Sequence, residues 1–542
     1  RLQRVLRVPI GPGEAGEVRA VAISPNGMLV AAAGWDAYYD VGQTNYVYVF
    51  NTATGAMVGR LGPLPNVIHE LEFSPDGYYL VAGLGNENGI RVWDVASRRE
   101  TYADKDYGGD VYGIAWASDG RLATTSYDGK VRLYSPELKL IKSAKTKGGV
   151  NPSGIAFSPD GKEIAVGFID TAAVDILSAK DLTRQARPDT KKVTNGNVAS
   201  VAWSSDGQTL YAGGRWRTND ETPVVAWSKR GRGPMKRIGG TSDTVMDLLG
   251  GAGGDLIYGA ADPQIGYFEG ETQHIWRDRV TADMRVKLDE NFLISSDAQG
   301  VRFGLNFGID EPYLFDIGML SFNQAPKAPR DMHQPDTTKL KVADWRHNGS
   351  PKLAGKPLEI ARYEWSRSVA VLPDASGLVL GSDFSVARFD RKANKEWTIP
   401  VPGAAWGVNI SDDGQLLVVA YGDGTIRWHR TSDGRELLAF FVHRETKEWV
   451  AWTPKGYYAT SPGGEKLIGW QVNRGWEDAA DFFPADRFRD RFYRPDIIQR
   501  VLAAGDEEVA ITDANREANR KSADDDLKNS LPPVIDILAP AE

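Results

Sequence analysis

The sequence contains no cysteine, which excludes disulfides, cysteine-ligated zinc, iron–sulfur clusters and cysteine nucleophiles. Histidine is also scarce: the six residues are scattered, and no HExxH or HxH motif brings two together. No run approaches the roughly 18 apolar residues of a membrane span. The net charge is −8 and no long Lys/Arg run occurs, so neither nucleic-acid nor membrane binding is expected. We expect no cofactor and no metal centre.

A repeated phrase is the main feature that is present. An apolar run is followed by Ser-Pro-Asp-Gly or a relative of it, and then by a second apolar run. Alternating apolar residues predict a half-buried strand, and the Pro, Asp and Gly predict a tight turn into an antiparallel neighbour. Adjacent copies lie roughly 40 to 50 residues apart, as in a four-stranded propeller blade. The turn acids that mark this period are Asp76, Asp119, Asp160, Asp206 and Asp413.

Weaker copies begin at Val245, Met284 and Ser368 and bring the total to about ten. The predicted fold is therefore all-β, made of about ten four-stranded propeller blades. Single propellers usually have about four to eight blades, which favours two rings in the 542 residues. The opening run Val5–Ile10 is expected to be an outer strand left from a preceding blade, or one that closes a ring with a distant blade.

The pattern divides the chain into three expected ranges. Residues 1–323 hold the first seven or so blades, and 324–476 hold an irregular insertion and further blades. Residues 477–542 form a helical extension and a linker toward a missing domain. Within it, Pro495 followed by Ile497, Ile498, Val501 and Leu502 predicts a short amphipathic helix. The charge-rich residues 506–530 are expected to be an exposed helix or a spacer.

The repeats resemble WD40 repeats, and one blade keeps the signature dipeptide Trp93-Asp94. The stretch from Glu448 to Leu502 is similar to bacterial WD40-repeat proteins that carry a caspase-like (peptidase C14) cysteine protease domain beyond the repeats. The phrases NVIHELEFSPDG, YGGDVYGIAW and TTSYDGKVRLY accompany it. This resemblance implies a WD40-type propeller that regulates a protease using a Cys–His dyad. Because the chain contains no cysteine, no catalytic residue of such a protease can be assigned to it. The protease would then be a missing domain or another subunit.

Long loops between the second and third strands of several blades carry aromatic and basic residues. Such loops, together with those that enter the blades, gather on one rim of a propeller and have the composition of protein-interaction hot spots. The residues expected to bind a partner there are Trp35, Tyr38, Tyr39, Asn86, Glu87, Tyr107, Tyr112, Arg215, Trp216 and Arg217.

The expected function is a cytoplasmic protein-interaction and regulatory platform. Its expected partner is a protein or peptide, namely a caspase-like protease domain or subunit, and the chain itself is not expected to be an enzyme. One alternative is a propeller enzyme, a metal-dependent hydrolase or lactonase, which needs inward carboxylates converging on a cation in the central channel. Another is a purely structural scaffold with one large apolar contact surface.

Overall fold

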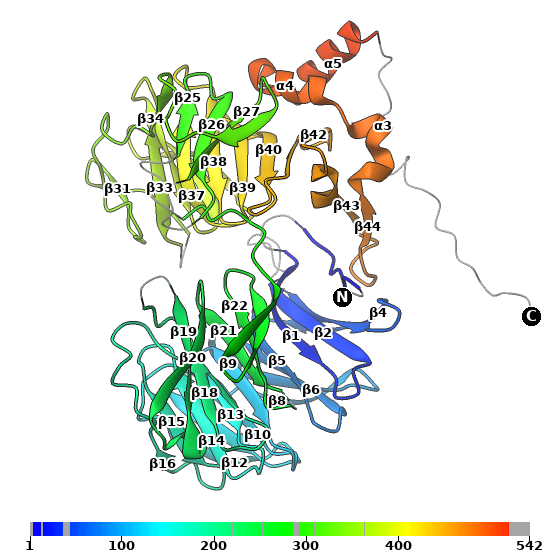
Figure 1. The fold of residues 1–542 in the computed structure, drawn as a ribbon, viewed down its shortest axis with the longest axis vertical. Helices are drawn as coiled ribbons and strands as arrows, with labels where there is room; N and C mark the ends of the chain where they lie inside the picture. Colours follow the sequence, from blue (N-terminus) through cyan, green and yellow to red (C-terminus); the bar gives the residue numbers. More distant parts are fainter. Residues whose placement is uncertain are drawn as a thin grey trace, which may run out of the picture. The chain divides into compact units, whose positions relative to one another are not determined.

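A computed structural model describes residues 4–11, 15–35, 44–218, 221–251, 253–285, 292–306, 311–361 and 364–519. These residues fold almost entirely as antiparallel sheets (Figure 1). The chain forms two compact units, and neither is continuous in sequence. Unit 1 comprises Arg1–Arg279 and Gln471–Phe482, and unit 2 comprises Val280–Trp470 and Phe483–Glu542. The boundaries expected at 323 and 476 do not coincide with these.

The described residues of unit 1 form six four-stranded sheets, each made of four consecutive strands. The first three sheets are β1 (Glu17–Ile23), β2 (Leu29–Trp35), β3 (Asn45–Asn51) and β4 (Met57–Leu64); β5 (Ile68–Phe73), β6 (Tyr79–Leu84), β7 (Ile90–Asp94) and β8 (Arg99–Asp104); and β9 (Val111–Trp116), β10 (Leu122–Ser126), β11 (Lys130–Tyr134) and β12 (Leu140–Lys145). The next three are β13 (Pro152–Phe157), β14 (Glu163–Phe168), β15 (Val174–Ser178) and β16 (Arg184–Ala186); β17 (Ser200–Trp203), β18 (Leu210–Gly213), β19 (Thr222–Trp227) and β20 (Met235–Thr241); and β21 (Val245–Gly250), β22 (Leu256–Ala260), β23 (Ile265–Glu269) and β24 (Thr272–Arg277).

The repeated phrase builds the turn between the first two strands of a sheet. In the second sheet the Ser74 hydroxyl donates to Asp76 Oδ1 (2.6 Å), and the N–H of Tyr79 donates to Ser74 Oγ (2.9 Å). Gly77 follows with a φ of 76°, a conformation in which a side chain is disfavoured. The same Ser–Asp bond recurs at Asp160, Asp206 and Asp413, so these acids serve the turns.

The apolar core of unit 1 lies between successive sheets. One buried cluster joins the first and second sheets, another the second and third, and another the third and fourth. The first strands also pack in order: β1 on β5, β5 on β9, β9 on β13, β13 on β17 and β17 on β21. The second to fifth sheets therefore each have a neighbouring sheet on both faces, which is the packing expected of propeller blades.

Residues from the far end of the chain complete unit 1. Gln471 Nε2 donates to the carbonyl of Val8 (3.0 Å), and the N–H of Ala480 donates to the carbonyl of Arg7 (3.2 Å). Val8 is buried in a small cluster with Tyr48 and other residues of the first sheet. The opening run thus contacts a distant segment, but residues 4–11 form no strand, so the expected pairing with a blade is not what the structure shows.

In unit 2 the described residues form three larger sheets and one small one. They are β25 (Leu293–Ser295), β26 (Gly300–Gly304), β27 (Pro312–Asp316), β28 (Ser321–Gln324) and β29 (Met332–His333); β30 (Val342–Ala343), β31 (Lys352–Leu353) and β32 (Lys356–Pro357); β33 (Ser366–Val371), β34 (Gly377–Ser382), β35 (Ser385–Asp390) and β36 (Lys395–Pro400); and β37 (Ala405–Ile410), β38 (Leu416–Tyr421), β39 (Thr425–Arg430), β40 (Glu436–Val442), β41 (Trp449–Trp452) and β42 (Tyr458–Thr460). A two-stranded sheet is formed by β43 (Gly469–Val472) and β44 (Asp481–Pro484). The weaker copies at Val245, Met284 and Ser368 correspond to real sheets.

The helices of the described residues are few and short. They are α1 (Ser228–Gly231), α3 (Arg489–Phe492), α4 (Pro495–Ala504) and α5 (Glu507–Glu517), with 3-10 turns η1 (Asn86–Asn88), η2 (Gly464–Leu467) and η3 (Ala485–Phe488). The predicted amphipathic helix is α4, whose four apolar residues are buried. Helix α5 is not simply exposed, because it packs on α4 and buries Ala510, Ile511 and Ala514. None of the helices in the described residues is long and apolar enough to cross a membrane.

Candidate functional site

One end of unit 1 gathers the starts of the first strands and the ends of the second strands. Because these strands are antiparallel neighbours, Glu17 pairs with Trp35, Ile68 with Leu84, and Val111 with Ser126. We call this end of unit 1 the rim. The loops that the sequence singled out for partner binding all leave or enter strands at this end.

Three aromatic rings from two successive sheets stack at the rim. His69 of β5 lies on Tyr112 of β9 with ring centroids 4.2 Å apart and an interplanar angle of 22°. Tyr112 in turn lies on Tyr127, which follows β10, with centroids 4.4 Å apart and an angle of 26°. All three side chains are partly buried, so the stack keeps a solvent-accessible side. Such rings offer a large, rigid apolar contact area at low entropic cost.

Charged groups surround this stack while its own rings are neutral. Burial lowers the pKa of His69 to about 4, with Asp110 opposing and Arg19 adding to the shift. Burial also raises the pKa of Tyr112, and the positive charges of Arg19 and Arg215 oppose that shift. At neutral pH the stack is therefore uncharged, and two cations and one anion lie close to it.

Three carboxylates lie near one another beyond the stack. Burial raises the pKa of Glu70 well above its usual value and that of Glu72 to about 7, and the charge of Asp247 adds to both shifts. The protein around Asp247 raises the pKa of that group to about 6, although the side chain still reaches solvent. Because β5 and β21 belong to sheets that are not neighbours in the packing order, these acids meet at the centre of unit 1.

Five of the predicted residues are accessible at the rim. Tyr112 is the central ring of the stack, and Arg215 is exposed near it. Arg217 is partly buried, and Asn86 and Glu87 are exposed in η1, where the N–H of Asn86 donates to Asp110.

Trp35, a sixth predicted residue, is partly buried at the end of β2. Tyr38 and Tyr39 lie outside the described residues. The predicted rim loops therefore do gather at one end of unit 1, and their binding role remains a proposal.

The prediction of an accessible rim side chain is wrong for Tyr107 and Trp216. Both are core residues, with exposed fractions of 5% and 6%. The Tyr107 hydroxyl lies 2.8 Å from both Thr124 Oγ1 and the Tyr134 hydroxyl, and the Arg132 guanidinium lies 3.8 Å from its ring centre. Trp216 packs in the apolar cluster between the fourth and fifth sheets. Loop position alone does not reveal a side chain that turns inward.

Sequence reasoning missed His69, Tyr127, Arg19 and Asp110. A signal for His69 exists: it is the second residue of β5, as Tyr112 is the second residue of β9. Equivalent positions one blade apart lie side by side in a propeller, so two rings there predict a contact. Arg19 and Asp110 carry no comparable signal, because single charges at strand ends are common.

The alternative of a metal-dependent enzyme can be checked against the arrangement of the His, Asp and Glu side chains. In the part of the chain that the structure describes, no group of three or more His, Asp or Glu side chains is arranged to hold a metal ion. The three central carboxylates are thus not a metal site, and the alternative of a metal-dependent hydrolase gains no support from them.

Three segments of the sequence, residues 4–38, 62–94 and 101–135, match the family model described as WD domain, G-beta repeat. The chain contains WD40 repeats. The second and third WD40 matches begin in the last strand of one sheet and end with β7 and β11, the third strands of the next sheets. The predicted WD40-type propeller fold, with its four-stranded antiparallel sheets and short helical C-terminal region, is confirmed.

Curated relatives match part of this chain. The small ribosomal subunit protein RACK1 of Medicago sativa is 31% identical over 141 residues, which cover 22% of this chain and 40% of the relative. The SIR4-interacting protein SIF2 of Saccharomyces cerevisiae is 25% identical over 171 residues, covering 30% of this chain and 31% of the relative. The chain thus spans well under half the length of these relatives.

A chain in the crystal structure of the Mitotic Checkpoint Complex is similar with a TM-score of 0.37 and 16% sequence identity. The match covers 79% of this chain and 91% of that chain.

Proposed function

We propose that the chain is a protein-interaction platform whose partner binds at the rim of unit 1. The observation that carries this proposal is the accessible stack of His69, Tyr112 and Tyr127 beside Arg215. Aromatic and arginine side chains dominate binding energy at protein interfaces, and a neutral stack can be desolvated at low cost. The name of the SIR4-interacting relative describes a binding protein, which supports the same role.

The partner we propose is a caspase-like cysteine protease domain or subunit, in a bacterial cytoplasmic system. Its support is the resemblance carried by Glu448 to Leu502. That stretch builds β41, β42 and α4 of unit 2, and its residues 471–482 belong to unit 1, so it is folded in both units. The propeller would recognise a regulator or substrate and the protease would act on it.

A capture experiment tests both levels of this proposal. The full chain, a Tyr112→Ala/Arg215→Ala variant and a Tyr78→Ala control serve as bait in extract of the native host. Tyr78 is 66% exposed in the turn at the opposite end of the second sheet. We expect the wild type and the control to retain a partner that the double variant loses, identified by mass spectrometry and confirmed with the purified proteins.

Each outcome decides a separate claim. Equal capture by the double variant would overturn the rim as the binding surface. Loss of a partner that has no caspase-like Cys–His protease associated with it would keep the rim and overturn the protease system. Circular dichroism of the double variant must match the wild type, since a misfolded propeller would lose the partner for another reason.

A further inference from the structure

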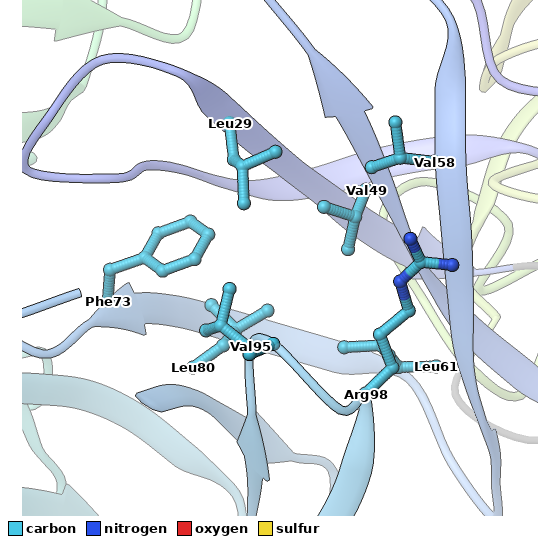
Figure 2. A pocket seen from close by; sticks show the side chains of 9 residues that line it. Leu29, Val49, Val58, Leu61, Phe73, Leu80, Val95 and Arg98 are labelled. Atoms are coloured by element: carbon cyan, nitrogen blue, oxygen red, sulfur yellow. The ribbon is translucent and has the colours of Figure 1, made fainter. Parts of the chain in front are cut away.

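A cavity of about 230 Å³ lies between the first two sheets of unit 1, and Figure 2 shows the side chains that line it. Val49 and Leu61 of the first sheet and Phe73 and Leu80 of the second sheet form its buried wall. The single charged side chain along its lining is Arg98, which is exposed in the turn between β7 and β8. The cavity is thus apolar inside and cationic at one side.

The identity of one turn residue explains why this cavity is open. Arg98 precedes the last strand of its sheet with a φ of 58°, and Leu138 and Leu182 occupy the same place in the next two sheets with a φ of 60° each. Both leucines are 6% exposed and fill the space between neighbouring sheets. The Arg98 side chain instead reaches solvent, so the corresponding space between the first two sheets is not filled.

The Arg98 guanidinium is available to a ligand. It forms no hydrogen bond or ion pair with any of the described residues. Its position depends on Gly59 of β4, because a Cβ at that residue would lie 2.8 Å from Arg98 Cδ and 3.1 Å from Nε. In Figure 2 the guanidinium extends past Leu61 toward Val58, while Phe73 lies across the cavity.

We propose that this cavity binds a small aliphatic carboxylate. Its hydrocarbon chain enters between the sheets, and its carboxylate pairs with the Arg98 guanidinium, which offers two parallel N–H donors. An aliphatic chain matches the buried wall because that wall contains no polar side chain to satisfy. The site is independent of the rim and of any partner bound there.

The volume sets the size of the ligand. The cavity of about 230 Å³ has room for a short aliphatic chain. That is below the roughly 300 to 1,000 Å³ of pockets for drug-sized ligands, which favours a small occupant. Hexanoate, with its six carbons and two oxygens, is the matching probe.

Titration of the full chain with hexanoate, followed by saturation-transfer NMR, tests the site. We expect saturable binding to the wild type and at least tenfold weaker binding to Arg98→Gln, which keeps a polar stem without the charge. The neutral analogue 1-hexanol should bind these two proteins alike. Arg98→Leu should bind neither probe, because the new side chain would fill the cavity as Leu138 does. Arg99→Gln, an exposed neighbour that does not line the cavity, should behave as the wild type.

Two results would overturn the proposal. One is the absence of saturable hexanoate binding, or equal hexanoate affinity in the wild type, Arg98→Gln and Arg98→Leu. The other is binding of a peptide that ends in a free leucine carboxylate without any binding of hexanoate, since the occupant would then be a protein terminus.

Discussion

The imidazole of His69 lies 4.2 Å from the ring of Tyr112, centroid to centroid, although the two residues belong to different sheets. The contact holds the imidazole partly out of water, which lowers its pKa to about 4. An imidazole in the unfolded chain titrates near 6.5. The folded state therefore binds fewer protons than the unfolded state between these two values.

This difference predicts an acid-sensitive rim. As the pH falls from about 6.5 to 4, protonation favours the unfolded chain, and His69 should cost unit 1 about 1 to 3 kcal/mol of stability. The His69→Gln variant should lack this part of the pH dependence. Native-state hydrogen exchange of the β5 and β9 amides, measured in both proteins at several pH values, checks the prediction. Parallel pH profiles of the two proteins would show that His69 is not responsible.

The raised pKa of Glu72 predicts a dependence of stability on pH that is opposite in sign to that of His69. Burial and the charge of Asp247 raise its pKa from about 4.5 to about 7, so the folded state favours the protonated acid. Stability is lost as the pH rises from about 4.5 to 7, because the carboxylate must then ionise at the centre of unit 1.

The Glu72→Gln variant should be more stable than the wild type by about 1 to 2 kcal/mol at pH 8 and no more stable at pH 4. Denaturant unfolding at the two pH values measures the difference. Glu87→Gln, at an exposed residue of η1, is the matched control and should change stability within about 0.5 kcal/mol at both pH values. A gain for Glu72→Gln that persists at pH 4 would contradict the ionisation argument.

Substitution of Tyr107 should lower the stability of unit 1 without loss of partner binding. Its buried hydroxyl lies 2.8 Å from Thr124 Oγ1 and from the Tyr134 hydroxyl, which itself donates to Asp104 Oδ2 (2.8 Å). Tyr107→Phe leaves Thr124 without this partner and should cost about 1 to 2 kcal/mol. Tyr78→Phe, at an exposed residue, is the control. If Tyr107→Phe abolished partner capture at a temperature where it is folded, the assignment of this residue to the core would fail.

The local sequence pattern predicts the individual sheets. It does not predict which distant segments of the chain pack against them. The phrase around Ser74 and Asp76 encodes its own turn through bonds between residues two to five apart, so it is readable in any copy. That residues near Gln471 return to pair with Val8 depends on contacts across most of the chain, and no periodicity encodes them. The rim loops were located correctly by strand order. The inward turn of Tyr107 depends on Arg132 and Thr124, which lie 17 and more residues further along the chain.

The turn before the last strand offers a final comparison, between Leu138 and Arg98. Leu138 is buried between the second and third sheets, whereas Arg98 in the same position is exposed. Leu138→Ala removes apolar atoms from a packed site and leaves a cavity, so it should cost about 2 to 4 kcal/mol. Arg98→Ala should change stability by no more than about 0.5 kcal/mol, because the space beside it is already open. Native-state hydrogen exchange of the β11 and β7 amides measures the two effects separately. Equal losses in the two variants would mean that Arg98 also closes its space, and the cavity would then have no reason to be open.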